Sequence, residues 1–142
     1  MDRSEARMLA FGLVFQIYVY KTEFPEVVDE FAEMREDLRR SDLSQYRYIL
    51  KVVRGVYDNL DEIDGQISRH LREGWTFDRL SRVMQAILRV AVYEILYMPD
   101  IPYRVSANEA VKLSKRFDTE DAPPFLNGVL AGIIRDTSPL SD

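Results

Sequence analysis

The sequence predicts an all-α protein of about six or seven helices in a single domain. Apolar residues recur every three or four positions along nearly the whole chain, which is the period of helices that bury one face. No run of apolar–polar alternation competes with that period. The one hairpin-like signal, Asn127-Gly128, is flanked by apolar residues at helical spacing, so we expect Gly128 to let another helix approach closely. The length of 142 residues suits one domain around one core.

The first half of the chain carries four helical patterns, which cover residues 6–20, 25–34, 44–56 and 60–71. Pro25 suits the first turn of the second helix, because proline lacks the N–H that a helix start leaves unpaired. The charged stretch "EDLRRSD" is expected to break the chain, after which Ser44 caps the third helix. An interruption is expected near "DNLDEIDG", before or within the fourth helix.

The second half of the chain contains the most apolar helix, predicted from Asp78 to about Met98. Between Val83 and Met98 its only charges are Arg89 and Glu94, which is typical of a helix surrounded by others. Pro99 ends this helix. The next helix is expected to begin at Ser106, with Glu109 at capping-box spacing. The last helix enters through "EDAPP" and carries an apolar face from Phe125 to Ile134.

Composition excludes several classes of function. The chain has no cysteine, so disulfides, thiolate catalysis and Cys-ligated metals are excluded. The chain has a single histidine and no phosphate-binding glycine motif. We therefore expect that it is not an enzyme and that it binds no metal or other cofactor. No membrane span and no signal peptide is apparent, so a cytoplasmic location is expected. The net charge of −5 argues against coating nucleic acid by bulk charge, but it leaves room for a local basic patch.

Short motifs in the second half stand in an order and spacing typical of a known family. Residues 86–133 contain "ILR-A-YE", "DIP--V--NEAV-L-K-F", "TE" and "F-NGVL", and residues 6–16 contain "AR--A---VFQ". With these motifs the chain resembles the NusB family of bacterial transcription antitermination factors. The segment from Glu23 to Trp75 agrees with the family only in its helical pattern.

The resemblance implies an all-helical, NusB-like domain of two packed halves, which we place at residues 1–136, with a frayed tail at 137–142. It also implies RNA binding, because NusB pairs with NusE, a small-subunit ribosomal protein, on the boxA element of nascent ribosomal RNA transcripts. That pair joins an antitermination complex on RNA polymerase. We therefore expect an antitermination factor that binds boxA-type RNA with NusE. Self-association is left open.

The proline-rich corner "DIPYRVSANEA" is interpreted as structural. Its two prolines fix the angle between the buried helix and the helix after it, and Glu109 is a candidate ion-pair partner for Arg89.

Candidate RNA-binding residues combine cations for phosphate with a ring for stacking. The set is Arg3, Arg7, Lys112, Arg116, Asp121 and Phe125. Arg3 and Arg7 form a basic end of the first helix, in line with the family. Lys112 and Arg116 either contribute to a positive electrostatic potential or simply form a solvated helix face. Asp121 and Phe125 are implied by the resemblance, with core packing of Phe125 an equal alternative.

Partner-binding candidates lie on the first helix and at the start of the buried helix. The resemblance points to Phe15, Asp78 and Met84 for NusE, and Tyr18 lies along the same helix as Phe15. Asp2 and Glu5 interrupt the consecutive arginines that relatives often carry. An alternative function is therefore a protein–protein adaptor of the same fold with weakened RNA affinity.

Overall fold

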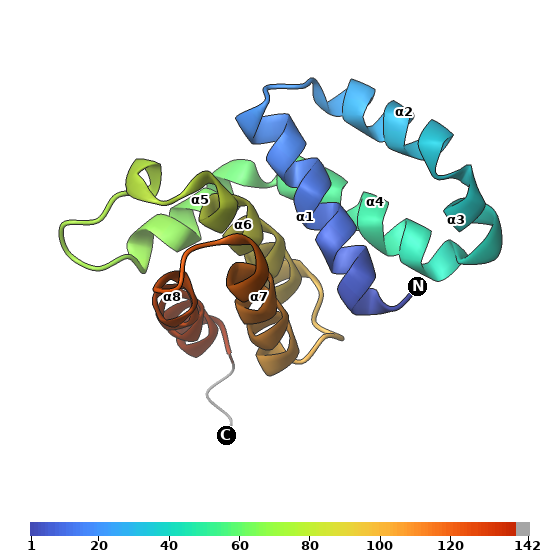
Figure 1. Ribbon diagram of the computed structural model, residues 1–142. Coiled ribbons are helices and arrows are strands. Elements are labelled where there is room, and N and C mark those ends of the chain that lie inside the picture. Colours follow the sequence, from blue (N-terminus) through green and yellow to red (C-terminus); the bar gives the residue numbers. More distant parts are fainter. Residues whose placement is uncertain (139–142) are drawn as a thin grey trace.

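The structure, a computed structural model, describes residues 1–138. These residues form eight α-helices and one short 3-10 turn, η1, and contain no strand (Figure 1). The all-α prediction is confirmed, and the number of helices exceeds the six or seven expected.

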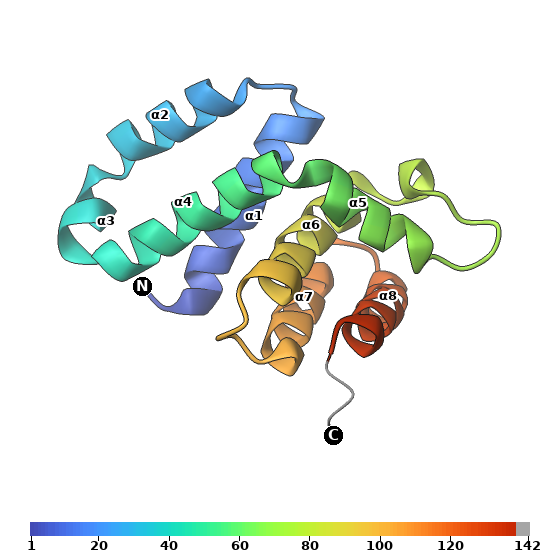
Figure 2. The ribbon, with the colours of Figure 1, turned by 180° about the vertical axis from the view of Figure 1, so that it is seen from behind.

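The helices divide into two halves that pack against each other (Figure 1 and Figure 2). The N-terminal half contains α1 (Arg3–Val19), α2 (Phe24–Met34), α3 (Glu36–Ser41) and α4 (Leu43–Asp58). The C-terminal half contains α5 (Leu60–Arg69), η1 (Phe77–Arg79), α6 (Arg82–Tyr97), α7 (Tyr103–Phe117) and α8 (Ala122–Thr137). The halves meet where α6 packs on α1 and α4.

The central element is α6, as its apolar sequence predicted. Every residue from Met84 to Ile95 is buried, because α6 contacts α1, α4, α5, α7 and α8. The run includes two charged side chains, Arg89 and Glu94. A buried charge requires an ionic or hydrogen-bonding partner, so these two residues determine much of how the neighbouring helices are arranged.

The stretch predicted to break the chain, "EDLRRSD", is mostly the helix α3. Glu36 accepts hydrogen bonds from Arg39 (3.1 Å) and Arg40 (3.2 Å), and Leu38 is the buried anchor. Such pairs three and four residues apart support a helix. A six-residue helix with one apolar contact shows no apolar period, which is why the sequence pattern missed it.

Three predicted helix starts were wrong. The side chain of Asp42, rather than Ser44, caps α4 by accepting from the Gln45 N–H. Asp78 lies in η1, and Ser81 caps α6 by accepting from the Met84 N–H. Since α7 already begins at Tyr103, Ser106 lies inside the helix.

The last helix, α8, ends next to the predicted domain boundary. Thr137 is the last residue of α8 and Ser138 follows it as the cap, so the helix extends into the predicted tail of residues 137–142. Residues 139–142 of that tail lie outside the described residues. The domain range 1–136 remains a prediction.

Replacing Pro102 by alanine is expected to lower the free energy of unfolding by about 0.4–1 kcal/mol. Pro102 precedes α7 with φ −57°, the angle that the proline ring imposes, so it restricts the unfolded chain without straining the folded one. Urea unfolding of the variant measures the change. A large loss of RNA affinity at unchanged stability would contradict the structural role.

Candidate nucleic-acid and partner interface

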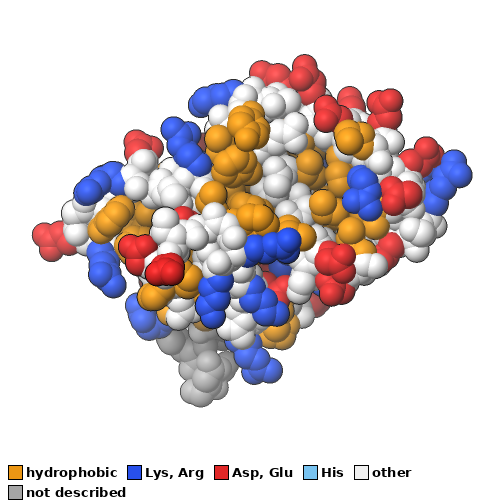
Figure 3. Space-filling model, in the orientation of Figure 1, with side chains coloured by type: hydrophobic (Ala, Val, Ile, Leu, Met, Phe, Trp, Pro, Cys, Tyr) orange, Lys and Arg blue, Asp and Glu red, His pale blue; other side chains and the backbone are white. Residues whose placement is uncertain are grey.

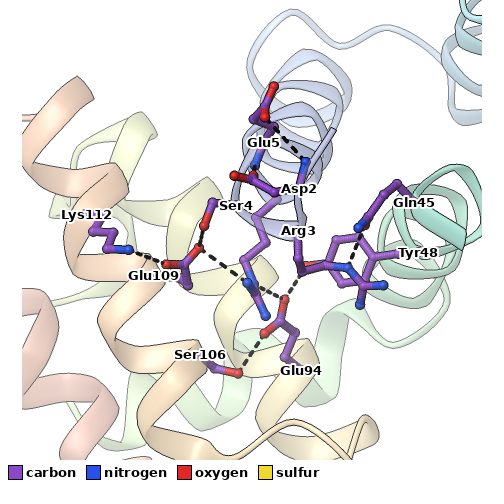
Figure 4. Close-up of polar contacts among 11 residues, drawn as sticks. Asp2, Arg3, Ser4, Glu5, Gln45, Tyr48, Glu94, Ser106, Glu109 and Lys112 are labelled. Carbon is purple, nitrogen blue, oxygen red and sulfur yellow. Dashed lines mark hydrogen bonds and ion pairs between the residues drawn. The ribbon is translucent and has the colours of Figure 1, made fainter. Parts of the chain in front are cut away.

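A buried polar network ties α1 to α4, α6 and α7, and its centre is Glu94 (Figure 4). Arg7 donates from Nε to the Glu94 carboxylate at 2.8 Å and from Nη1 to Glu109 at 3.3 Å. Glu94 also accepts from the Tyr48 hydroxyl and, at 2.7 Å, from the Ser106 hydroxyl. Arg7 is 6% exposed and Glu94 1%. The network therefore holds charges that are almost completely shielded from water.

The charges of this network stabilise one another. Burial lowers the pKa of Arg7, but the hydrogen bond and charge of Glu94 outweigh it and the pKa is raised. Burial alone would raise the pKa of Glu109, yet hydrogen bonds from Ser4 and Lys112 and the charge of Arg7 lower it. Burial, together with the Glu94 charge, raises the pKa of Tyr48. The hydroxyl of Tyr48 therefore stays protonated and donates to Glu94.

Two expectations conflict with this network. Arg7 was expected to contact phosphate, but its guanidinium is buried and engaged by two carboxylates. Glu109 was expected to pair with Arg89, but Arg89 instead forms a two-pronged pair with Asp64 of α5, with both N···O distances 2.9 Å. Burial explains both results, because a buried arginine needs an anionic partner and each one pairs with the carboxylate that the fold places nearest to it.

Three of the candidate cations lie at the surface of α1 and α7. Arg3 donates to Gln45 at 2.7 Å with its guanidinium 4.3 Å from the centre of the Tyr48 ring. Lys112 pairs with Glu109 at 2.9 Å, and Arg116 lies over the Phe117 ring at 5.2 Å. Figure 3 shows Lys and Arg side chains gathered over α7 on this face, with acidic side chains beside them. The face can therefore attract phosphate only locally.

Lys112 and Arg116 share a shallow groove between α1 and α7 with Asp2 and Glu5. Asp2 and Glu5 form the capping box of α1, so these acids are fixed there by the helix start itself. They reduce the positive potential beside the two cations.

Asp121 and Phe125 lie together at the start of α8, on the wall of a hollow of about 170 Å³. The opposite wall comes from the segment before α6, where the Trp75 ring lies 5.2 Å from that of Phe125. Phe125 is half-buried, so it combines some core packing with a surface that a ligand can reach.

Four aromatic rings form a row across α1 and the end of α7. From Phe117 to Phe11, Phe15 and Tyr20, successive ring centres are 5.4, 6.2 and 5.7 Å apart. Tyr20 is 71% exposed and Phe117 40%. Figure 3 shows hydrophobic side chains extending along the exposed side of α1. Exposed aromatic rings are typical of protein interfaces, so Phe15 lies in a suitable surface for a partner.

The other partner candidates lie elsewhere. Tyr18 packs under the Arg89 guanidinium, which also covers Phe77 at 4.9 Å, so Tyr18 lies beside the η1 turn that carries exposed Asp78. Burial raises the pKa of Tyr18 to about 12. Its hydroxyl is buried and has no hydrogen-bond partner within residues 1–138. Met84 is buried and lines the hollow with Phe125, so its expected contact with a partner conflicts with its position.

Sequence reasoning missed Trp75, Tyr20 and Phe117 as surface residues. Their signal was present, because each is a large ring next to a predicted helix end. A ring in sequence does not reveal its exposure, however, and here the adjoining helices leave all three at the surface.

The described part of the chain offers few other kinds of site. Within residues 1–138, no cluster of three or more His, Asp or Glu side chains is arranged to hold a metal ion. No helix in the same residues has both the length and the apolar character needed to cross a membrane.

Comparison with known proteins gives consistent matches over nearly the whole length. The family model described as the NusB family matches residues 4–135. The transcription antitermination protein NusB of Clostridium novyi is 37% identical over 95% of this chain and 99% of its own. The protein of the same name from Oceanobacillus iheyensis is 41% identical over 94% of this chain and 99% of its own.

Solved structures agree with these sequence matches. A NusB structure from T. maritima superposes with a TM-score of 0.85 and 32% identity, covering 98% of this chain and 94% of that one. A crystal structure of the antitermination factors NusB and NusE in complex with dsRNA superposes with a TM-score of 0.80 and 28% identity, covering 96% of this chain and 99% of that one.

Proposed function

The chain belongs to the NusB family, and from that premise we propose that it is a transcription antitermination protein that binds RNA together with NusE. The observation that carries the proposal is the match over nearly the whole chain to proteins named for antitermination. The likeness to a NusB chain that was solved with NusE and RNA supports the two partners.

In the finer proposal, the RNA is of boxA type in nascent ribosomal RNA transcripts, and the complex joins RNA polymerase in the cytoplasm. The chain acts by binding and carries out no catalysis. Arg3, Lys112 and Arg116 contact phosphates, because they are the candidate cations at the surface. Asp121 and Phe125 contact a base, and the aromatic row that includes Phe15 contacts NusE.

The adaptor alternative gains support from Arg7. Because Arg7 is buried in the network, the N-terminal basic patch is thinner than the sequence suggested. Each lost phosphate contact weakens RNA binding. In that alternative NusE binds while RNA does not.

The test is a fluorescence anisotropy titration of labelled boxA-type RNA and of a scrambled RNA, each with and without NusE. The proposal expects the boxA-type RNA to bind more tightly than the scrambled one, with a further gain when NusE is present. Equal binding of both RNAs would contradict specific recognition. Binding of NusE with no binding of either RNA would favour the adaptor.

Replacing Arg116 by alanine is expected to weaken boxA-type and scrambled RNA equally, and to reduce the slope of log K against log salt by roughly 0.7. A phosphate contact on a single strand releases counterions but reads no base. Titrations at several salt concentrations measure the slope. The matched control is Arg40→Ala, an exposed arginine of α3 whose side chain is 74% exposed, which should leave the slope unchanged. A loss confined to boxA-type RNA would show that Arg116 reads a base.

A further inference from the structure

The hollow at the start of α8 has one wall whose residues are given no role by the family resemblance. Phe125, Asp121 and Ala122 form one side, and Trp75 and Arg79, which lie before α6, form the other. At about 170 Å³ it is smaller than the roughly 300–1,000 Å³ of pockets that enclose whole small molecules. Its size suits a flat fragment rather than a metabolite. Trp75, the only tryptophan of the chain, is 40% exposed at its rim.

Each of the two rings of the hollow has a guanidinium group beside it. The guanidinium of Arg79 lies 4.7 Å from the centre of the Trp75 ring, and that of Arg72 lies 5.9 Å from the centre of Phe125. Arg79 also donates to the Gly74 carbonyl at 2.8 Å, which fixes the loop that carries Trp75. The rings meet at 60°, so they present two faces to the hollow rather than closing it by stacking on each other.

Charged groups of both signs surround the hollow. Asp118 and Asp121 line its polar side, where Asp118 accepts from the Ser81 hydroxyl at 2.8 Å and Asp121 from the Thr119 hydroxyl at 2.9 Å. Carboxylates repel phosphate but accept hydrogen bonds from the N–H groups on base edges. Arg79 also lines the hollow, and both Arg72 and Arg79 are exposed beside the two rings. The carboxylates can therefore meet the edge of a base between the rings, and the exposed guanidinium groups can meet the phosphates beside it.

We propose that Trp75 forms, with Phe125, a binding site for one unpaired RNA base. In this site the Asp118 and Asp121 carboxylates accept from the base edge, and Arg72 and Arg79 hold the flanking phosphates. The proposal rests on the proposed function and deepens it, because Asp121 and Phe125 are expected from the resemblance while Trp75, Arg72, Arg79 and Asp118 are newly assigned. Stacking on aromatic rings is the usual way in which proteins hold splayed-out bases of single-stranded RNA.

The direct test uses the fluorescence of Trp75 in the wild-type chain. Titration with unlabelled boxA-type RNA should quench this fluorescence, with half-saturation at the RNA concentration found by anisotropy. Trp75→Ala, in complex with NusE, should lose about 5- to 150-fold in RNA affinity. Trp75→Phe should retain most of the affinity, since a ring remains to stack. The salt slope of Trp75→Ala should equal that of the wild type, because a stacking contact releases no counterion.

A second measurement separates a binding role from a folding role. The experiment uses a series of boxA-type RNAs, each lacking the base at one position. At a single position, removal of the base should weaken RNA binding by the wild type but should not further weaken RNA binding by Trp75→Ala. That coupling identifies the base that stacks on Trp75. Thermal melting of Trp75→Ala should stay close to that of the wild type, because the ring lies at the rim.

The outcomes distinguish this inference from the proposed function. If the wild type binds boxA-type RNA specifically while Trp75→Ala binds it equally well, the base site is overturned and the antitermination role stands. The base site is likewise overturned if Trp75→Ala impairs binding of NusE and leaves RNA binding intact. If the wild type binds no RNA with NusE present, both proposals fail.

Discussion

Replacing Arg7 by alanine is expected to destabilise the fold by about 3–5 kcal/mol. The variant leaves Glu94 buried without its cation, while Tyr48 and Ser106 still donate to it. Such a loss is a large part of the roughly 5–15 kcal/mol that keeps a domain folded. Urea or thermal unfolding measures it, and the affinity of the remaining folded molecules for RNA should change little.

The matched control is Arg3→Ala, one helical turn earlier on α1. Arg3 is half-exposed and donates to Gln45 rather than to a buried carboxylate. Its removal is expected to change stability by no more than about 1 kcal/mol. If Arg7→Ala melts like the wild type yet loses RNA binding, Arg7 contacts RNA and its main role is not to stabilise the buried network.

Replacing Gly55 by alanine is expected to destabilise the fold by about 1–3 kcal/mol or more. A Cβ at Gly55 of α4 would stand 2.0 Å from Cε1 of Tyr93 on α6, far inside contact distance. The Tyr93 ring is buried and stacked on Tyr97 at 5.3 Å, so it cannot move away freely. Chemical unfolding measures the loss.

Two further variants identify the cause. Gly12→Ala on α1 meets nothing within 4 Å, so it is expected to stabilise the helix by about 0.5–1 kcal/mol. In the double variant Gly55→Ala with Tyr93→Leu, the loss of stability should be smaller than the sum of the losses in the two single variants, because the ring that clashes is gone. Equal stability of Gly55→Ala and the wild type would contradict the close contact of α4 with α6.

Gly55 also shows what the sequence did not reveal. The close approach was expected at Gly128, yet a Cβ there would meet nothing within 4 Å, and the contact lies at Gly55 instead. Both glycines lie within helical patterns, and the sequence alone does not tell which one faces a neighbouring ring. The position depends on how α4 and α6 cross, which is a tertiary property.

The helices themselves were predictable because long amphipathic segments carry their period in the sequence. The nearly uncharged sequence of α6 predicted that other helices would surround it, and all residues from Met84 to Ile95 are buried. Short elements and caps were less predictable. A Ser or Asp near a helix start is a candidate cap, but Ser106 instead donates to Glu94 inside α7.

The charged residues of the candidate site were predictable in kind but not in pairing. A buried Arg89 needed an acid, and it has one in Asp64 rather than Glu109. Glu109 pairs with Arg7, which sequence reasoning had placed on the RNA surface. Ion pairs between helices depend on distances that only the folded arrangement fixes. The hollow that joins Phe125 to Trp75 was missed for the same reason, since Phe125 lies in α8 and Trp75 in the loop between α5 and η1, far apart in the chain.

RNA is expected to lie over the start of α8 and the loop before α6, while the Arg7 network holds α1 in place from inside. Amide hydrogen exchange of the complex with NusE, with and without boxA-type RNA, tests this placement most directly. We expect RNA to protect amides in residues 72–82 and 118–126, and to leave those of α2 and α3 unchanged. Protection confined to α2, α3 or α4, with none at the start of α8, would contradict this placement of the RNA.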